Sequence, residues 1–312
     1  MSESPNRKII GLDIGGTKTA VVLGTAEGEI LSRTEFPTNV SSPFDTQFAR
    51  LCSVVHATLD KVGGPIFAIS VSIGGPMDAL EGIIKSPPNL PMWVDVPLKK
   101  LLKDEFQLPV YVEHDGNAGA LAEFYFGAGR GANSIVFLTL GTGFGAGLIL
   151  DRKLYRGTSC LAGEIGHIRV ADDGPEAFGK RGSLEGYCSG SGIEKLATFL
   201  FPKRWITPVP VRELAELARK DDAEAKAVFD TSGKYLGRAF AILADLINPE
   251  KIILGALGFR LGPLLLEPAM EVLKKEALSQ AVSCCQIVPA ELGEKIGDVA
   301  SLCAALNQEG LL

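Results

Sequence analysis

The sequence has few of the residues on which several classes of protein depend. Its 312 residues include 31 lysines and arginines against 37 aspartates and glutamates, which gives a net charge of −6. A protein that mainly grips nucleic acid needs a basic surface, so this balance argues against a nucleic-acid partner. No apolar run reaches the roughly 20 residues that span a bilayer, and the stretch 239–247 is interrupted by Asp245. We therefore expect no contact with a membrane.

The sequence also lacks a Cys-x-x-Cys pair, and the spacing of its cysteines is irregular. Residues 1–8 lack the apolar stretch of a secretory signal peptide. This combination predicts a cytoplasmic protein with reduced thiols and no metal-binding Cys-x-x-Cys pair. The six cysteines are Cys52, Cys160, Cys188, Cys284, Cys285 and Cys303.

The pattern of β-branched runs, glycine turns and helical periodicity indicates an α/β protein. Residues 8–14, 19–23 and 30–36 are typical of a meander of hairpins. No long linker is present, so we expect two packed lobes: residues 1–117 with 297–312, and residues 118–296. Further strands are predicted at 67–73, 110–113, 134–140, 145–150, 251–254 and 286–289. Helices are predicted at 44–62, 97–105, 117–126, 192–201, 211–218, 222–247, 263–278 and 298–307, and loops at 87–97 and 172–182.

One stretch of sequence recurs. Residues 9–17 and 135–143 each resemble a strand, a glycine turn that carries a threonine, and the start of a second strand. Two similar turns, one in each lobe, suggest a duplicated fold with a ligand in the cleft between the halves.

The first of these turns, in the segment Asp13-Ile14-Gly15-Gly16-Thr17-Lys18, suits a phosphate. Glycines at a hairpin tip let backbone N–H groups approach phosphate oxygens, and the Thr17 hydroxyl and Lys18 ammonium add donors. Asp13 can hold a hydrated Mg²⁺ that bridges phosphates. A plain tight hairpin is the alternative, because Gly-Gly between strands is a common turn.

Two more glycine clusters extend this interpretation. The segment 140–147 contains four glycines between apolar strands. Together with the first turn, this favours phosphate binding at Gly141, Thr142 and Gly143 over a merely strained turn. A strand that ends at Gly255 suits an adenine or ribose lying flat on the backbone, although strand–glycine–helix junctions are common.

Six motifs in this order resemble the ROK family of sugar kinases and repressors: DIGGTK, VEHDGNAGALAE, LGTGFGAG, AGEIGH, GSLEGYCSG and ILGALG. The resemblance extends from about Lys8 to Leu306. It implies a two-lobed α/β fold of the actin-like, hexokinase type with a cleft between the lobes. It also implies ATP and Mg²⁺ as cofactors, a hexose substrate and a homodimer.

The chemistry of Asp115 fits this resemblance. A carboxylate at the end of a strand can accept the proton of a sugar hydroxyl as that oxygen attacks the γ-phosphate of ATP. Aspartate is also a good N-cap, and the sequence alone favours that structural role. In the resemblance, Asp115 matches the catalytic base of the family.

Sugar hydroxyls are bound by polar side chains, with carboxylates as strong acceptors. The resemblance implies that Glu164, His167 and Glu185 contact the hexose, and that the proline-rich loop supplies Asn89. His114 stands where the family usually has asparagine, and neutral histidine also offers a donor and an acceptor. This departure leaves the identity of the sugar open. Asn89 is a weaker candidate than these, as are Gly75, Asp78 and Trp93, with turn formation or packing as the alternative for the last three.

A second departure concerns zinc. The family often carries a CxCGxxGCxE motif whose cysteines bind zinc with the histidine that matches His167. Here the cysteine positions hold Glu176, Phe178 and Ser183. Phenylalanine cannot ligate and serine is a poor ligand, so we expect no zinc. We expect Phe178 to anchor the loop 172–182 by packing instead.

The leading hypothesis is therefore an ATP-dependent hexose kinase that acts on the 6-hydroxyl of glucose or a related hexose. A sugar-responsive transcriptional regulator is the alternative, since the family contains repressors. Such proteins carry an additional N-terminal helix-turn-helix region, and the first phosphate motif already begins at Asp13. A sugar-binding protein without catalysis is a third alternative, against which Asp115 argues.

Overall fold

The computed structural model describes residues 7–311, which form two compact units. Unit 1 contains the chain up to Phe126, the segment Arg156–Cys160 and the chain from Glu294 onward. Unit 2 contains Gly127–Tyr155 and Leu161–Gly293. The predicted boundary after residue 117 falls inside helix α3 (Asp115–Phe126), which lies entirely in unit 1.

Unit 1 is built on a five-stranded sheet with the order β3-β2-β1-β4-β7. Strands β1, β2 and β3 form the predicted antiparallel meander, and β4 and β7 continue the sheet in parallel with β1. Parallel strands end at the same edge, so the ends of β1, β4 and β7 lie together. The bounds are β1 Lys8–Ile14, β2 Lys18–Thr25, β3 Ile30–Pro37, β4 Ile66–Ile73 and β7 Val110–His114.

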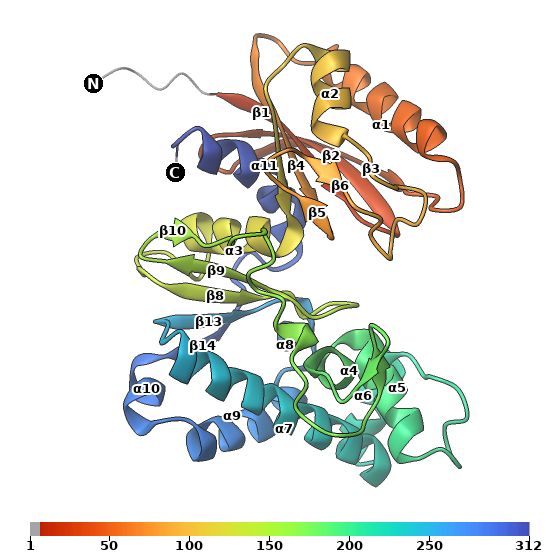
Figure 1. The fold of residues 1–312 in the computed structure, drawn as a ribbon, viewed down its shortest axis with the longest axis vertical. Helices are drawn as coiled ribbons and strands as arrows, with labels where there is room; N and C mark the ends of the chain where they lie inside the picture. Colours follow the sequence, from red (N-terminus) through yellow and green to blue (C-terminus); the bar gives the residue numbers. More distant parts are fainter. Residues whose placement is uncertain (1–6, 312) are drawn as a thin grey trace. The chain divides into compact units, whose positions relative to one another are not determined.

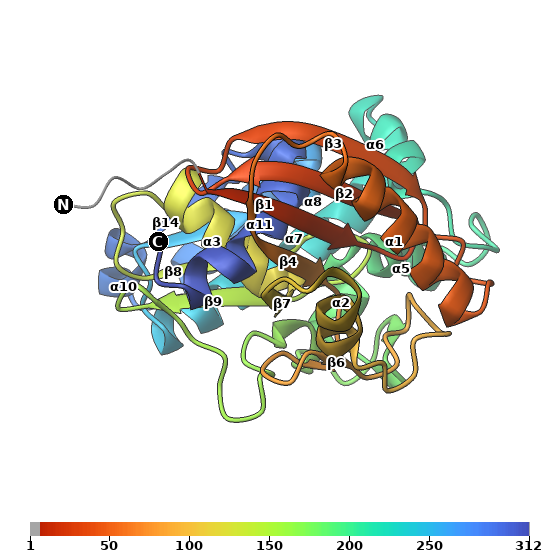
Figure 2. The same cartoon turned by 90° about the horizontal axis from the view of Figure 1, so that it is seen from above.

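Helices cover both faces of this sheet (Figure 1). Helices α1 (Phe44–Leu59) and α2 (Leu98–Phe106) bury one face with Ile10, Leu12 and Ile14 of β1. The alternate residue Ile9 packs against α11 (Ile296–Gln308) on the other face, where α3 also lies. Gly11 lets α11 approach closely, because a Cβ there would collide with the Ser301 hydroxyl. The view in Figure 2 shows α1 running along the sheet.

The segment between β4 and α2 is mostly irregular, as its prolines predict. It contains only a small hairpin, formed by β5 (Met77–Asp78) and β6 (Ile83–Ile84), before the loop that carries Asn89. Trp93 fixes this loop, because its buried indole N–H donates to Gln47 of α1 over 3.0 Å. The packing alternative for Trp93 is confirmed.

Unit 2 repeats the sheet of unit 1. Its strand order is β10-β9-β8-β13-β14, again with an antiparallel hairpin followed by two parallel additions. The prediction of a duplicated fold is confirmed by this topology. The bounds are β8 Ile135–Leu138, β9 Ala146–Leu150, β10 Lys153–Leu154, β13 Lys251–Leu254 and β14 Gln286–Pro289.

The helices of unit 2 surround α7 (Ala223–Leu246), whose Phe229 and Phe240 lie in the core. The others are α4 Leu184–Cys188, α5 Gly190–Leu200, α6 Val211–Arg219, α8 Ala256–Leu261, α9 Pro263–Glu276 and α10 Ser279–Cys284. A 3₁₀ turn occupies Ile165–His167, and a second one, Gly293–Lys295, lies where the chain passes from unit 2 to unit 1. None of the helices in the described range 7–311 is long and apolar enough to cross a bilayer.

Three local predictions were wrong. The loop expected at 172–182 contains a hairpin of β11 (Glu176–Ala177) and β12 (Lys180–Arg181), because Gly179 permits a tight turn. The helix predicted at 263–278 stops at Glu276, and Ser279–Cys284 forms a separate helix, α10. Strand β8 ends at Leu138, earlier than predicted, which leaves residues 139–145 for a wide glycine turn.

Candidate functional site

The first glycine turn is a hairpin tip with a fixed backbone. The Gly15 N–H donates to the Lys18 carbonyl over 3.1 Å, and the Thr38 hydroxyl donates to the Gly15 carbonyl over 2.6 Å. Thr17 and Lys18 are exposed, and Lys18 pairs with Glu35 at 2.9 Å. These contacts hold the backbone of the tip in a defined position, and Lys18 already pairs with Glu35 there.

Gly16 brings this tip against the loop that carries Asn89. A Cβ on Gly16 would lie 2.7 Å from the Asn89 carbonyl oxygen, so no larger residue fits without moving the loop. Two predicted site residues are thus brought together, and Gly16 has a packing role besides any contact with phosphate.

Asp13 lies one strand residue before the tip, on the face toward α11. A Cβ on Gly297, in the first turn of α11, would lie 2.6 Å from Asp13 Oδ2. Burial, together with the neighbouring carboxylates of Asp115 and Asp298, raises the pKa of Asp13 to about 6. A carboxylate held in this way favours a nearby cation.

Asp115 begins α3 at the end of β7. Its side chain is 55% exposed, and its Oδ1 accepts the Gly116 N–H over 2.7 Å. His114 Nδ1 lies 3.4 Å from the same oxygen. The carboxylate is thus fixed at one oxygen and open to solvent, as a proton acceptor should be.

The two glycines that follow β4, Gly74 and Gly75, lie next to the side chains of Asn89, His114 and Asp115. A Cβ on Gly74 would lie 3.5 Å from Asn89 Nδ2 and 3.6 Å from Asp115 Oδ2. A Cβ on Gly75 would lie 3.0 Å from the His114 ring. Asn89, His114 and Asp115 therefore gather around one point. Sequence analysis missed Gly74, although a glycine pair directly after a buried strand was a signal for it.

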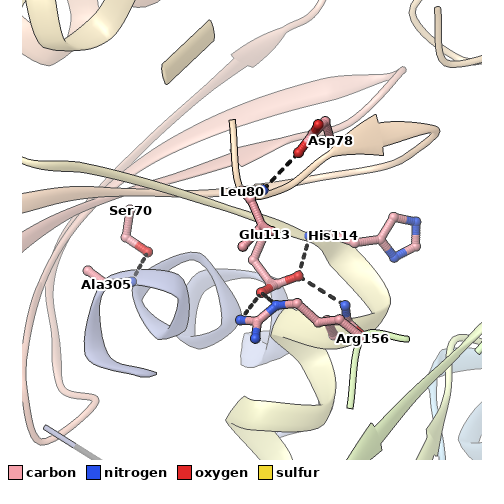
Figure 3. Close-up of polar contacts among 8 residues, drawn as sticks. Ser70, Asp78, Leu80, Glu113, His114, Arg156 and Ala305 are labelled. Carbon is pink, nitrogen blue, oxygen red and sulfur yellow. Dashed lines mark hydrogen bonds and ion pairs between the residues drawn. The ribbon is translucent and has the colours of Figure 1, made fainter. Parts of the chain in front are cut away.

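Glu113 and Arg156 form a buried anchor behind this point (Figure 3). Glu113 is fully buried, and its Oε2 accepts from Arg156 Nε over 2.9 Å and Nη2 over 2.6 Å. Its Oε1 accepts from Asn117 Nδ2 over 2.9 Å and from the His114 N–H over 3.1 Å. Sequence analysis missed both residues; a charged residue inside an apolar strand was the available signal.

Asp78 serves a turn. Its Oδ1 accepts the backbone N–H groups of Leu80 and Glu81 over 3.1 and 3.0 Å (Figure 3 draws the first). The turn alternative for Asp78 accounts for these contacts.

The second glycine turn lies in unit 2, between β8 and β9. Its Gly141 carbonyl accepts the Gly190 N–H over 2.8 Å, and its Thr142 carbonyl accepts the Ser191 hydroxyl over 2.8 Å. Apart from Gly141 and its two neighbours in the chain, no residue has an atom within 4 Å of the position that a Cβ on Gly141 would take. The first residues of α5 therefore fix the carbonyl groups of the turn, and the side of Gly141 on which a Cβ would lie is open.

A cavity of about 700 Å³ in unit 2 adjoins this turn. Three arginines, from α6 and α8, give it positive charge, and Leu257 and Leu261 give it apolar surface. A cavity of this size and lining suits a flat ring attached to an anionic group. The lining residues are Gly141, Thr142, Gly190, Ser191, Glu194, Pro210, Val211, Arg212, Ala215, Arg219, Ala256, Leu257, Arg260 and Leu261.

Gly255 lies at the end of β13 and has a packing role. A Cβ there would lie 2.8 Å from the Leu138 carbonyl oxygen. The Gly255 N–H also donates to that oxygen over 2.8 Å. Gly255 is therefore needed for the close approach of β13 and β8.

Glu185 connects the glycine turn to α4. Its Oε2 accepts the Phe144 N–H over 3.0 Å, and a Cβ on Gly143 would lie 3.2 Å from the same oxygen. Burial raises the pKa of Glu185. The turn and a predicted sugar ligand thus form one local structure.

Glu164 and His167 lie at the 3₁₀ turn, and both are exposed. The His167 ring stacks on the Phe178 ring with 4.4 Å between centroids and 22° between planes. Phe178 is 53% exposed. The packing contact of Phe178 is thus a ring stack on His167 outside the core.

The positions of the family's zinc cysteines do not fit a metal. Ser183 is fully buried, and its hydroxyl accepts the Gly186 N–H to cap α4. Phe178 offers no ligand atom. Within residues 7–311, no group of three or more His, Cys, Asp or Glu side chains is placed to hold a metal ion.

Two glycine hairpins on two sheets of the same topology define an ATPase-like fold of the actin and hexokinase class, and comparison with known proteins agrees. Residues 9–306 match the ROK family. A glucokinase of Halalkalibacterium halodurans is 32% identical over 97% of this chain and 96% of its own length. A ROK family glucokinase from Streptomyces griseus, solved with glucose and AMPPNP, is 31% identical with a TM-score of 0.79. That alignment covers 97% of this chain and 100% of the other.

Repressors are also among the relatives. A xylose repressor of Bacillus spizizenii is 27% identical over 91% of this chain and 73% of its own length. The chain belongs to the ROK family, and the predicted α/β fold of the actin-like, hexokinase type is confirmed.

Proposed function

We propose that the protein is an ATP-dependent hexose kinase, which transfers the γ-phosphoryl group of MgATP to the 6-hydroxyl of glucose or a related hexose. One observation carries this proposal: the exposed Asp115 carboxylate, with Asn89 and His114 beside it around the Gly74-Gly75 strand end. A homodimer in the cytoplasm remains part of the prediction.

Asp115 acts as the general base in this proposal. Its free carboxylate oxygen accepts the proton of the sugar hydroxyl while the hydroxyl oxygen attacks the γ-phosphorus. The Gly116 N–H fixes the other oxygen, and the buried Glu113–Arg156 pair fixes the strand end before it. This arrangement supports a base whose position is set before the sugar binds.

Asn89 and His114 of unit 1, and Glu164, His167 and Glu185 of unit 2, are the proposed sugar ligands. Glu185 uses Oε2 for the Phe144 N–H, which leaves Oε1 to accept a sugar hydroxyl. Carboxylates, imidazole and amide together supply both acceptors and donors, as a polyhydroxylated substrate requires.

The proposed nucleotide ligands are the two glycine turns, with Gly15, Gly16, Thr17 and Lys18 in unit 1. Gly141, Thr142 and Gly143 belong to unit 2, with Gly255 at the end of β13. The adjoining cavity and its arginines support an adenosine group with its phosphates.

Asp13 is the residue that would hold Mg²⁺. Its pKa, raised to about 6 by burial and by two neighbouring carboxylates, fits a side chain that gains from a nearby cation. Magnesium in such sites is usually bound through one or two carboxylates and the substrate phosphates, and it neutralises charge on those phosphates. The protein's part is to hold that carboxylate under the hairpin tip.

The test is release of ADP over a panel of hexoses, with Asp115→Asn beside the parent and Asp104→Asn as an exposed control. We expect Asp115→Asn to lower kcat by about 10²–10⁴-fold while sugar binding, measured by calorimetry, stays within a few-fold. Near-normal turnover by Asp115→Asn on the preferred sugar would rule out the assigned base.

The repressor relatives favour one second candidate, a sugar-responsive regulator. The same panel separates the two. A sugar that binds calorimetrically but gives no ADP release in the parent protein would favour the regulator, whereas turnover that depends on both sugar and ATP favours the kinase.

A further inference from the structure

Phe178 occupies a backbone conformation that is unusual for its side chain. It lies in the two-residue turn between β11 and β12, where Ala177 pairs with Lys180. Its φ is 51° and that of Gly179 is 68°. Positive φ at both central residues is the type I′ turn, which favours Asn-Gly. For a bulky aromatic residue this conformation is strained, and such strain is concentrated at functional sites.

The strained turn does not bury the ring. Phe178 is 53% exposed, so core packing does not repay the strain. Its ring contact is the stack on His167, at 4.4 Å and 22°. The same hairpin holds the backbone of His167, because Lys180 Nζ donates to the His167 carbonyl. Both the side chain and the main chain of His167 are thus held by β11–β12.

Side-chain contacts from neighbouring residues secure the hairpin itself. Lys195 Nζ donates to the Glu176 carbonyl over 2.9 Å, and Arg181 Nε donates to the Gly174 carbonyl over 3.0 Å. Arg181 also pairs with Asp173 at 3.0 Å. These contacts fix both strands of the turn and therefore the position of Phe178.

We propose that Phe178 is a positioning residue that fixes the imidazole of His167. The ring stack, presented by the turn between β11 and β12, holds the imidazole in one orientation. Stacking leaves both ring nitrogens free for hydrogen bonds, whereas a metal would occupy one. The role of His167 toward sugar rests on the proposed function, but the stack itself does not.

The decisive variant is Phe178→Asn. Asparagine is favoured at this turn position, so the variant relieves the strain while it removes the ring. Phe178→Tyr keeps the ring and serves as the conservative rescue. Ile206→Asn is the matched control, because Ile206 is an apolar residue of unit 2 that is 82% exposed.

The first measurement is NMR of the imidazole groups, with His167 assigned by the loss of its signals in His167→Gln. We expect the His167 ring protons to be shifted upfield in the parent and in Phe178→Tyr. In Phe178→Asn they should move to ordinary positions, and chelation with EDTA should leave the parent unchanged. Unchanged His167 signals in Phe178→Asn, or signals that move on chelation, would overturn the proposal.

The second measurement separates positioning from stability. We expect Phe178→Asn to raise the KM for the hexose about 3- to 10-fold, the range of one aromatic contact, with kcat within about two-fold. Its Tm should be unchanged or higher. A Tm lowered together with activity, or a KM equal to that of Ile206→Asn, would show a structural role only. Absence of turnover in the parent on every hexose refutes the proposed kinase, while the NMR result still decides the stack.

Discussion

The buried Glu113–Arg156 pair makes the sharpest prediction about stability. Replacing Arg156 with methionine keeps most of the side-chain volume but removes both charged donors from Glu113 Oε2. Because Glu113 is fully buried, its charge is then left without a counterion. Breaking a buried pair in this way costs about 3–5 kcal/mol.

The two partners are not equivalent, and this asymmetry tests the reasoning. Arg156 keeps 22% of its side chain exposed, so it can still reach water when Glu113 is changed. Glu113→Gln also keeps an oxygen for Asn117 and the His114 N–H. We therefore expect Glu113→Gln to cost less, about 1.5–3 kcal/mol, the value of a charged hydrogen bond.

The measurement is urea unfolding followed by fluorescence in a Trp205→Phe background. The protein has two tryptophans, Trp93 in unit 1 and Trp205 in unit 2. Trp93 then reports the unit that holds the pair.

Two results would refute this account. An Arg156→Met loss below about 1 kcal/mol would mean that the pair does not carry the cost of a buried charge. A Glu113→Gln loss larger than that of Arg156→Met would contradict the asymmetry. The same variants should lower kcat, by up to about 10²-fold, because they loosen the strand end that positions Asp115.

Three further outcomes are expected. Gly143→Val should weaken ATP binding in a nucleotide titration while the thermal melt stays cooperative. Gly16→Val is a less specific test, since its side chain would also displace the Asn89 loop. ATP binding equal to that of the parent in both variants would show that the two turns have only a structural role. Asp13→Asn should raise the free energy of unfolding at pH 8 by at most about 3 kcal/mol, because folding raises the Asp13 pKa from 3.8 to about 6. The cost of ionising Asp13 in the folded protein grows as the pH rises from about 4 to 6 and is absent below pH 4, so an equal effect of the substitution at pH 4 would contradict this reasoning. Protein purified without a metal-affinity tag should contain no stoichiometric zinc by elemental analysis and stay active after chelation; about one tightly held zinc per chain, with activity lost on its removal, would show the opposite.

Much of the fold could be predicted because it rests on local periodicity. The strands at 8–14, 251–254 and 286–289 and the long helix α7 agree with their predicted ranges to within a residue or two. The repeated glycine turn also predicted the duplication of the sheets. Short elements such as α4 and α10 were missed because five or six residues carry too little periodicity to separate a helix from a loop.

The candidate site was only partly predictable, and the reason lies in sequence separation. The hairpin tip, the segment around Asp115 and the glycine turn each consist of neighbouring residues, so each can be recognised from the sequence alone. Arg156 lies 43 positions from Glu113, and no local pattern connects them. Gly16 and Asn89 are also far apart in the sequence, so their contact forms only when the chain has folded.

The role of Phe178 could not be derived from the absence of the zinc cysteines alone. The absence of the zinc cysteines was readable from the sequence, and it led to the expectation that Phe178 anchors the loop 172–182 by ordinary packing. The positive φ of Phe178 could not be read from its residue type, because sequence preference at that turn favours asparagine or glycine. A residue that violates its local preference and yet contacts His167 is better explained by that contact than by the turn. Departures from a family motif are therefore informative twice: once for the ligand set that is lost, and again for the residue that stands in its place.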